Sequence, residues 1–297
     1  MHRFSLRQLE YFVACVDHGS TADAASALNV SQPTISIAVT KLEDQLGVQL
    51  LRRHHSQGVT ATASSENILH SARALLAHAT DLQSQIMTKG DTISGELKLG
   101  SFSTLASSIL PRLVNSFSSK HPEIQLKITE GTQVELLDGL NSGQLELALL
   151  YDLDLPSSIK KTKLTELTPH AVLPAGHPLS TQTDIDITDL AEEPFILLDI
   201  PPSREYFLSL FKSVGLEPNI VHSSPSLELV RGLVGYGLGF SLLVTRPLSD
   251  MTYDGQQLSI KPLRNKLTKS SIVLAHHEDL RPTQLMTLFR KLAQSIM

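Results

Sequence analysis

Residues 20–47 read STADAASALNVSQPTISIAVTKLEDQLG and contain two short helical patterns joined by a tight turn. Ser20 or Thr21 can cap the first helix, which is narrow because alanine dominates it. Ser31 can cap the second helix, and Pro33 falls in its first turn, where the missing N–H costs nothing. Two short helices joined in this way predict a helix-turn-helix, which places its second helix in the major groove of DNA.

The flanking sequence completes a small domain around these two helices. Residues 5–17 have the apolar spacing of an earlier helix, and residues 48–62 are rich in turn and strand formers that suit a β-wing. Cys15 falls on the same helical face as two aromatic residues, which predicts a buried thiol. A redox-sensing role is the alternative, but no cation lies beside Cys15 in the sequence. Residues 1–62 are therefore predicted to form an all-α winged helix-turn-helix domain.

One long helix is predicted across residues 63–90. Apolar residues recur there at every third or fourth position: Ile68, Leu69, Ala72, Leu75, Leu76, Ala79, Leu82 and Ile86. A long helix with a single apolar stripe needs a partner to cover that stripe, and a second copy of itself is the simplest one. The alternative is that the stripe packs on its own chain. The preferred interpretation is a linker helix that forms a homodimer.

Residues 91–297 alternate between strand and helix patterns. A βαβαβ series between residues 96 and 151 predicts a parallel sheet covered on both faces. A second series follows, and the last strand and helix, residues 270–296, can return to the first lobe. The fold class is therefore α/β, with a two-lobed C-terminal domain that has a ligand cleft between its lobes. Lobe I spans about residues 91–163 and 268–297, and lobe II spans about residues 164–267.

Composition limits the classes of function. The 297 residues carry a net charge of −5 and one cysteine, which excludes a disulfide within the chain and a cysteine-rich zinc module. No stretch has the hydrophobicity of a signal peptide or a membrane span, so we expect a cytoplasmic protein with no membrane partner. Residues 1–62 contain five lysine or arginine residues and five acidic ones. Because their net charge is zero, DNA contact has to depend on a few placed groups.

Several short motifs follow one another along the chain. They are Leu9-Glu10-Tyr11-Phe12, Gly19-Ser20-Thr21, Ala24-Ala25, Leu28 to Ser36, Leu42 to Gly47, His121-Pro122-Glu123-Ile124, Glu130-Gly131, Gly143 to Ala148 and Gly235 to Gly239. Together with the long helix and the two lobes, they resemble the LysR-type transcriptional regulators over essentially the whole chain. The resemblance implies a winged helix-turn-helix, a periplasmic-binding-protein-like effector domain and a homodimer or homotetramer. It also implies double-stranded DNA and a small-molecule effector as partners.

The candidate DNA contacts lie at the start of the second helix and at the start of the wing. They are Ser31, Gln32, Thr34, Ile35, Ser36, Arg52 and Arg53. Glutamine can pair with an adenine edge, threonine can contact a base or a thymine methyl, and a serine beside free N–H groups favours phosphate. Wing arginines can reach the backbone or the minor groove. The alternatives are that Ser31 and Thr34 only cap the helix, and that the arginines pair with carboxylates of their own domain.

The candidate effector residues lie at strand-to-helix junctions. They are Ser101, Phe102, Ser103 and Thr104, then Thr132 and Gln133, and Ser203 and Arg204 in the second lobe. The resemblance places them around the inducer pocket. Hydroxyl groups, free N–H groups and a guanidinium suit a small carboxylate or a phosphate-bearing metabolite. The alternative is ordinary N-capping at each helix.

Neither metal nor catalytic chemistry is expected. His54-His55 and His276-His277 are adjacent pairs, which on a strand point to opposite faces, and no carboxylate or cysteine completes a set at helical spacing. The glycine-rich residues 235–239 follow a predicted helix and lead into a strand, the reverse of a dinucleotide fingerprint. No nucleophile elbow or phosphate-binding loop occurs. The competing interpretation, a solute-binding or enzymatic α/β protein with an N-terminal helical interaction module, therefore has less support, and no cofactor is expected.

Overall fold

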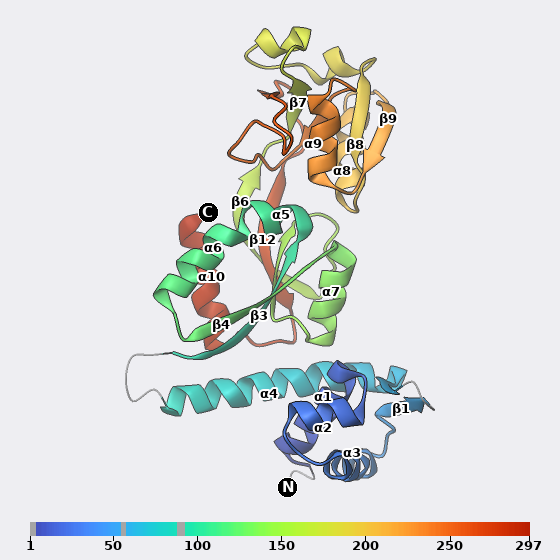
Figure 1. The fold of residues 1–297 in the computed structure, drawn as a ribbon, viewed down its shortest axis with the longest axis vertical. Coiled ribbons are helices and arrows are strands. Elements are labelled where there is room, and N and C mark those ends of the chain that lie inside the picture. Colours follow the sequence, from blue (N-terminus) through green and yellow to red (C-terminus); the bar gives the residue numbers. More distant parts are fainter. Residues whose placement is uncertain (1–3, 55–57, 88–92) are drawn as a thin grey trace.

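The structure, a computed structural model, describes residues 4–54, 58–87 and 93–297, with the backbone alone at residues 84–87. Figure 1 shows a helical N-terminal domain at one end, a long helix crossing beside it, and two α/β parts stacked beyond that helix. The chain therefore has a helical domain, a linker helix and two lobes, in the order in which the sequence patterns occur.

The helical domain contains a helix-turn-helix and a two-stranded wing. Three serines cap its helices: Ser5 forms a capping box, Ser20 accepts from two backbone N–H groups and Ser31 accepts from one. Gly19 and Gly47 end the first and third helices in left-handed conformations, with φ of 64° and 71°. The elements are α1 (Leu6–His18), α2 (Thr21–Ala27), α3 (Gln32–Leu46), β1 (Leu51–His54) and β2 (Gly58–Ala61).

The core of this domain joins all its helices to the linker. Phe12 and Cys15 of α1 and Ile35 of α3 are fully buried there, and Leu69 and Ala72 of the linker helix are buried against them. Burial raises the pKa of the Cys15 thiol to about 11, and the nearby Arg53 only partly opposes this effect. The thiol is therefore protonated at neutral pH, and the prediction of a buried core cysteine is confirmed.

The wing is fixed to the helices at both of its strands. The Glu43 carboxylate of α3 accepts hydrogen bonds from the N–H groups of Leu50 and Leu51, at 2.8 and 3.1 Å. Gly58 begins β2 with φ of 92°, and a Cβ atom there would lie 2.1 Å from the carbonyl oxygen of Gly19. Only glycine allows so close an approach, so the turn after α1 sets the position of the wing.

The linker helix α4 (Glu66–Met87) follows a short 3-10 turn, η1 (Ala63–Ser65). Its apolar stripe is divided between two environments. Leu69 and Ala72 are buried in the helical domain, whereas Leu75 and Leu82 are 45% and 59% exposed. Packing on its own chain therefore covers the first part of the stripe and leaves an apolar ridge beyond it. Ile86, also placed on the stripe, lies outside the side chains that the structure describes.

Lobe I is built on a five-stranded sheet of order β4-β3-β5-β12-β6, covered by helices on both faces (Figure 1). Its last strand and helix return from the end of the chain, as predicted. The elements are β3 (Gly95–Phe102), α5 (Ser103–Ser108), α6 (Leu110–Lys120), β4 (Ile124–Gly131), α7 (Gln133–Ser142), β5 (Leu147–Tyr151), β6 (Ile159–Leu167), β12 (Ser270–His277) and α10 (Gln284–Ile296).

The βαβαβ series is parallel, as predicted, because β3 pairs in parallel with β4 and with β5. The complete sheet is mixed, because the returning strand β12 runs antiparallel to both of its neighbours, β5 and β6. Since β6 leads toward lobe II and β12 returns from it, adjacent strands have to run in opposite directions. The apolar pattern of residues 105–119 predicts one continuous helix, which is wrong, because the helix is broken at Ile109. The ring of Pro111 would clash with the carbonyl of Ser107 in a continuous helix, so the chain starts a new one.

Lobe II holds a three-stranded antiparallel sheet of order β10-β7-β11 and a parallel pair, β8-β9. The glycine-rich residues 235–239 form the predicted turn between a helix and a strand. None of the helices described in the chain is long and apolar enough to cross a bilayer. The elements are β7 (His170–Pro174), η2 (Pro178–Thr181), η3 (Ile187–Leu190), β8 (Pro194–Leu198), α8 (Ser203–Lys212), β9 (Asn219–Ser224), α9 (Leu227–Gly235), β10 (Ser241–Leu243) and β11 (Leu258–Pro262).

Candidate functional site

A polar surface lies at the start of α3, on the side of the helical domain away from α4 (Figure 1). The Gln32 amide nitrogen donates to Thr21 Oγ1 at 3.2 Å and to Ser36 Oγ at 2.9 Å. Ser31 Oγ accepts from the Thr34 N–H at 3.3 Å and lies 2.7 Å from Thr34 Oγ1. Ser31 therefore caps the helix, as expected, and the Gln32 carboxamide is held in one place on an exposed surface.

One candidate DNA contact has to be corrected. Ile35 is fully buried and packs in the core of the helical domain. It follows Thr34 on α3, where the helical rotation turns its side chain inward between the helices. Ile35 therefore supports the polar surface from below and is not exposed to DNA. The neighbouring Ile37 is the exposed isoleucine of this helix, at 69%.

The two wing arginines are consecutive residues of β1, so their side chains leave the strand on opposite faces. Arg52 pairs in register with Thr60, and Arg53 pairs with Val59. Both arginines are exposed, and neither forms an ion pair with a carboxylate among the residues that the structure describes. The alternative in which they neutralise acidic groups of their own domain is therefore not observed. Their two charges are available at the surface of a domain whose formal net charge is zero.

One candidate effector residue of lobe I, Thr104, belongs to a buried hydroxyl chain. Thr104 Oγ1 lies 2.8 Å from the phenol oxygen of Tyr151, at the end of β5. The same phenol also hydrogen-bonds Thr245 of lobe II. Burial raises the pKa of Tyr151 to about 12, although both threonine hydrogen bonds act in the opposite direction. The phenol is therefore protonated, and it joins the two lobes through neutral groups.

The other candidates in lobe I have different environments. Ser101 and Phe102 are fully buried, and the Phe102 ring packs edge-on against Tyr151 with a centroid separation of 5.4 Å. Gln133 is also buried; its Nε2 donates to the Leu153 carbonyl at 2.7 Å, and its Oε1 has no hydrogen-bond partner in the described part of the chain. Ser103 is half-buried and donates to the Gly131 carbonyl at 3.3 Å.

Of three further candidates, only Thr132 has the N-capping role given as the alternative, because the start of α8 has no side-chain cap. Thr132 forms a capping box with Glu135, and these hydrogen bonds lower the pKa of the glutamate. Arg204 pairs with Asp199 of its own lobe at 2.9 Å. Ser203 is buried at the start of α8. Among the described residues, no hydrogen bond or ion pair connects Ser203 or Arg204 with lobe I.

The sequence did not indicate the junction at Arg73, a residue of α4. This side chain is only 5% exposed; it forms an ion pair with Asp17 of α1, and its Nη1 donates to the Ser142 carbonyl at the end of α7 at 2.6 Å. His70 lies one turn earlier on α4. Burial, reinforced by His277, lowers its pKa, while the backbone of Asn141 acts in the opposite direction. The linker helix is thus attached to both the helical domain and lobe I.

Two protein-family models match the chain and together cover most of its length. Residues 90–297 match the model of the LysR substrate binding domain. Residues 6–66 match the model of the bacterial regulatory helix-turn-helix proteins of the lysR family. The chain belongs to the LysR family of transcriptional regulators. Members of this family bind DNA and small-molecule effectors and form oligomers. They are regulators and not enzymes, which confirms the expectation of a non-catalytic function.

Known LysR-family proteins are similar over nearly the full length. HinK, a LysR family transcriptional regulator from Pseudomonas aeruginosa, is 41% identical, with 98% of both chains covered and a TM-score of 0.67. The hydrogen peroxide-inducible genes activator of Pectobacterium carotovorum is 30% identical over 80% of this chain and 79% of its own. OxyR C199D from Pseudomonas aeruginosa has a TM-score of 0.82 at 24% identity and covers 99% of this chain, which shows the same fold.

This LysR-family chain also has a cavity that the sequence did not predict. Its volume is about 250 Å³, and it lies between α4 and lobe I, away from Thr104 and Tyr151. Ala77 of α4, Glu96 of β3 and Leu285 of α10 are among the residues that line it, as are His70 and Arg73. The cavity therefore adjoins the junction between the linker and the effector domain.

Proposed function

We propose that this LysR-family regulator reads DNA with the start of α3 and the wing, and that an anion bound at the lobe junction controls it. Residues 1–62 bind DNA, residues 63–90 dimerise, and residues 91–297 bind the effector. Because the partner is DNA, we place its action in the cytoplasm. The observations that carry the proposal are the positioned Gln32 at the start of α3 and the two exposed wing arginines, Arg52 and Arg53, which form no ion pair among the described residues.

The α3 surface provides two kinds of DNA contact. The Gln32 carboxamide carries a donor and an acceptor, which match the major-groove edge of adenine. Both of its N–H groups are engaged by Thr21 and Ser36, so pairing with adenine would exchange one of these hydrogen bonds for one to the base. Ser31, Thr34 and Ser36 surround it with hydroxyl groups, and the first N–H groups of α3 favour a phosphate. Arg52 and Arg53 contribute charge at the wing, where they reach phosphates or the minor groove. The base contacts supply specificity, and the arginines supply most of the salt-dependent affinity.

The double variant Arg52→Ala/Arg53→Ala tests the wing contacts. We expect weaker binding to any duplex and a flatter plot of log K against log[salt], since each lost phosphate contact reduces the slope by about 0.9. In a dimer four arginines are removed, so the slope decreases by up to about 3.6. Fluorescence anisotropy across a salt series measures this slope. A control variant, Lys160→Ala/Lys161→Ala in lobe I, should leave the slope unchanged; an equal decrease there would contradict the assignment.

The dimer is proposed to form through the exposed ridge of α4. Leu75 and Leu82 are seven residues apart, so they lie on the same face two turns from each other. The first part of the apolar stripe is already covered by α1, and the ridge continues it toward the end of the helix. A second α4 would cover both leucines and bring two DNA-reading surfaces together. Two such dimers would form the proposed homotetramer.

Replacing Leu82 by glutamate should weaken self-association. The carboxylate would be placed against its copy in the partner helix, and a buried charge without a counter-ion is strongly unfavourable. Sedimentation velocity is expected to show a shift toward the monomer at low micromolar concentration. The control is Leu229→Glu, which changes an exposed leucine of α9 in lobe II. Unchanged association of Leu82→Glu would exclude α4 as the dimer interface.

The effector is proposed to bind beside the Thr104-Tyr151-Thr245 chain. These hydroxyl groups already connect the lobes, so a ligand that replaces one of their hydrogen bonds changes how the lobes meet. Gln133 offers an unpartnered buried acceptor nearby on α7. Hydroxyl donors and one amide, without an unpaired cation among them, favour a small carboxylate that carries its own hydrogen-bond donor.

The effector proposal predicts a specific loss in Thr104→Val. A thermal-shift screen of small mono- and dicarboxylates against the full chain should find a ligand that raises the melting temperature, because it binds the native state. Thr104→Val keeps the side-chain volume and removes the hydroxyl, so affinity for that ligand should decrease by about tenfold or more. Ser119→Ala removes an exposed hydroxyl of α6 as a control. A ligand response equal to that of the wild type would overturn the site.

A further inference from the structure

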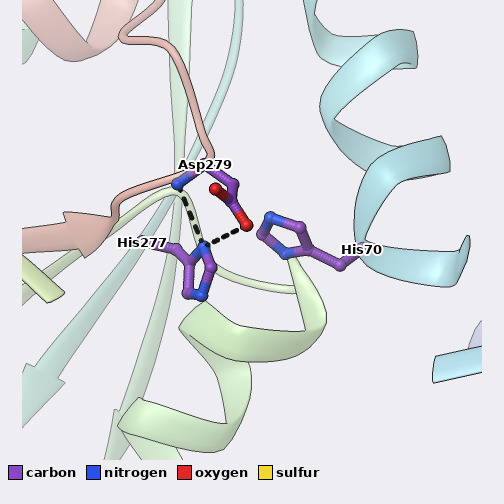
Figure 2. Close-up of side chains that lie close together, drawn as sticks. All are labelled: His70, His277 and Asp279. Carbon is purple, nitrogen blue, oxygen red and sulfur yellow. Dashed lines mark hydrogen bonds and ion pairs between the residues drawn. The ribbon is translucent and has the colours of Figure 1, made fainter. Parts of the chain in front are cut away.

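Three potential metal ligands meet at the contact between α4 and lobe I (Figure 2). His70 comes from α4, His277 ends β12, and Asp279 lies in the turn that follows. One ligand atom from each residue lies within 4.8 Å of the others. The two imidazole rings are 4.5 Å apart between centroids and are inclined by 60°. The cluster therefore joins the linker helix to the far end of the chain.

His70 has an unusual environment for a polar side chain. It is only 7% exposed, and neither ring nitrogen has a hydrogen-bond partner of ordinary geometry among the described residues. A buried polar group without a partner costs on the order of 1–3 kcal/mol, so proteins seldom retain one without a role for it. The ring also lines the cavity at the α4 junction, from which a small ion can reach it.

His277 and Asp279 face this ring with lone pairs available. Nδ1 of His277 accepts a hydrogen bond from the Asp279 N–H at 3.2 Å, so the lone pair of this nitrogen points toward Asp279. Oδ2 of Asp279 lies 3.9 Å from the same nitrogen (Figure 2). The Asp279 side chain is 76% exposed and can turn toward an ion without breaking the core. An ion at this point would replace the weak N–H contact of His277.

We propose that His70, His277 and Asp279 bind a divalent transition-metal ion of the zinc class. Two imidazoles and one carboxylate are the donors that such ions prefer, whereas magnesium and calcium select oxygen ligands. Zinc–nitrogen bonds of about 2.0–2.1 Å place two ligands of a tetrahedral ion about 3.3 Å apart. The ligand atoms of the three residues lie within 4.8 Å of one another, so small side-chain rotations would bring them to the distances that the ion needs. Water from the cavity would occupy the fourth position.

Arg73 is the group that opposes a cation at this point, because it lies one turn from His70 on the same helix face. Its charge is already engaged by Asp17, which forms an ion pair with it. Asp279 supplies the compensating negative charge on the other side of the cluster. The sequence did not predict this set of ligands, because His70 lies far from His276-His277 in the chain. In the structure, the turn after β12 brings Asp279 close to His277, and α4 contributes His70.

A metal ion at this cluster would attach α4 to lobe I. The ion would link a residue of the dimerisation helix to residues of the effector domain, and it would therefore stiffen the joint through which the lobes and the DNA-binding domain communicate. This inference does not depend on the DNA contacts or on the effector site. Failure of the metal site would leave the proposed function unaffected, and the converse also holds.

The test is a titration of untagged, chelator-treated full-length protein with Zn²⁺, and with Co²⁺ as a spectroscopic probe. We expect one ion per chain, a higher melting temperature with Zn²⁺, and no comparable effect of Mg²⁺. Asp279→Asn and His70→Leu should each weaken Zn²⁺ binding by about tenfold or more. His78→Gln, on the same helix, should bind as the wild type does. Asp279 is exposed, so its variant is expected to fold.

Two results would overturn the site. One is Zn²⁺ binding no stronger than Mg²⁺ binding in the wild type. The other is Zn²⁺ binding that persists unchanged in both Asp279→Asn and His70→Leu, which would place the ion on other histidines of the chain. The Co²⁺ absorption spectrum separates these cases, because loss of an imidazole or a carboxylate ligand changes its bands, whereas a change elsewhere in the protein does not.

Discussion

Replacement of Gln32 by alanine is expected to weaken binding to a specific duplex by about 1–3 kcal/mol per half-site, roughly tenfold to a hundredfold. Non-specific binding should change little. The carboxamide is positioned by Thr21 and Ser36 before DNA arrives, which limits the side-chain entropy lost on binding, and one of these hydrogen bonds is exchanged for a bond to the base. Competition anisotropy with specific and random duplexes measures both affinities.

A matched control shows whether the loss belongs to the α3 surface. Gln144→Ala removes the same side chain from an exposed position in lobe I, and it should bind both duplexes as the wild type does. Ser36→Ala removes one of the two groups that position Gln32, so it is expected to have a smaller effect in the same direction. If Gln32→Ala keeps full specificity, the base contact has to be assigned to another residue of α3.

Replacement of Arg73 by alanine is expected to lower the free energy of unfolding by about 3 kcal/mol. The change leaves the Asp17 carboxylate without its counter-ion and the Ser142 carbonyl without its donor. Asp17 keeps 34% exposure and can be partly solvated, so we expect the lower end of the range for a broken buried pair. Urea unfolding monitored by circular dichroism measures the loss, and Arg112→Ala, an exposed arginine of α6, provides the control.

A double-mutant cycle shows whether the two residues act as a pair. Asp17→Ala in the wild-type background leaves the buried Arg73 guanidinium without its counter-ion, so it should also cost about 3 kcal/mol, but much less in the Arg73→Ala background. Strict additivity of the two changes would show that the ion pair contributes nothing. Because Arg73 connects α1 and α7 through α4, the single variant should also change how effector binding alters DNA affinity.

The helical domain could be predicted from sequence because local signals decide it. Ser20 and Ser31 cap the helices that they precede, and Gly19 and Gly47 end helices as left-handed glycines do. Each signal acts within a few residues, so the local sequence is enough to predict where these helices begin and end. The position of the wing was harder to predict, because it depends on the contact between Gly58 and Gly19, which lie far apart in the sequence.

The α/β domain was harder to predict, for physical reasons. β6 carries lysines and threonines on a partly exposed edge of the sheet, so its pattern lacks the apolar run of a buried strand. β11 was missed for a related reason, since only part of it is buried. The direction of β12 depends on where the chain returns from lobe II, which residue periodicity does not encode.

The candidate sites also divide into residues that a local motif indicates and residues that only the tertiary fold brings together. Ser31 and Gln32 could be chosen from one motif, since both lie on one helix turn. Ile35 was chosen with them, but the rotation of the helix buries it. The hydroxyl chain through Tyr151 and Thr245, and the cluster of His70 with His277, join segments that only tertiary folding brings together. Such contacts leave no spacing signal in a single sequence.

Selection from a randomised duplex library tests the central claim most directly. Full-length protein at about 0.15 M salt should enrich duplexes that share two inverted half-sites, with centres about one helical turn of DNA or a multiple of it apart. Gln32→Ala should fail to enrich them. If the wild type enriches no sequence, or if both proteins enrich the same one, the account of a dimeric regulator that reads DNA through α3 is contradicted.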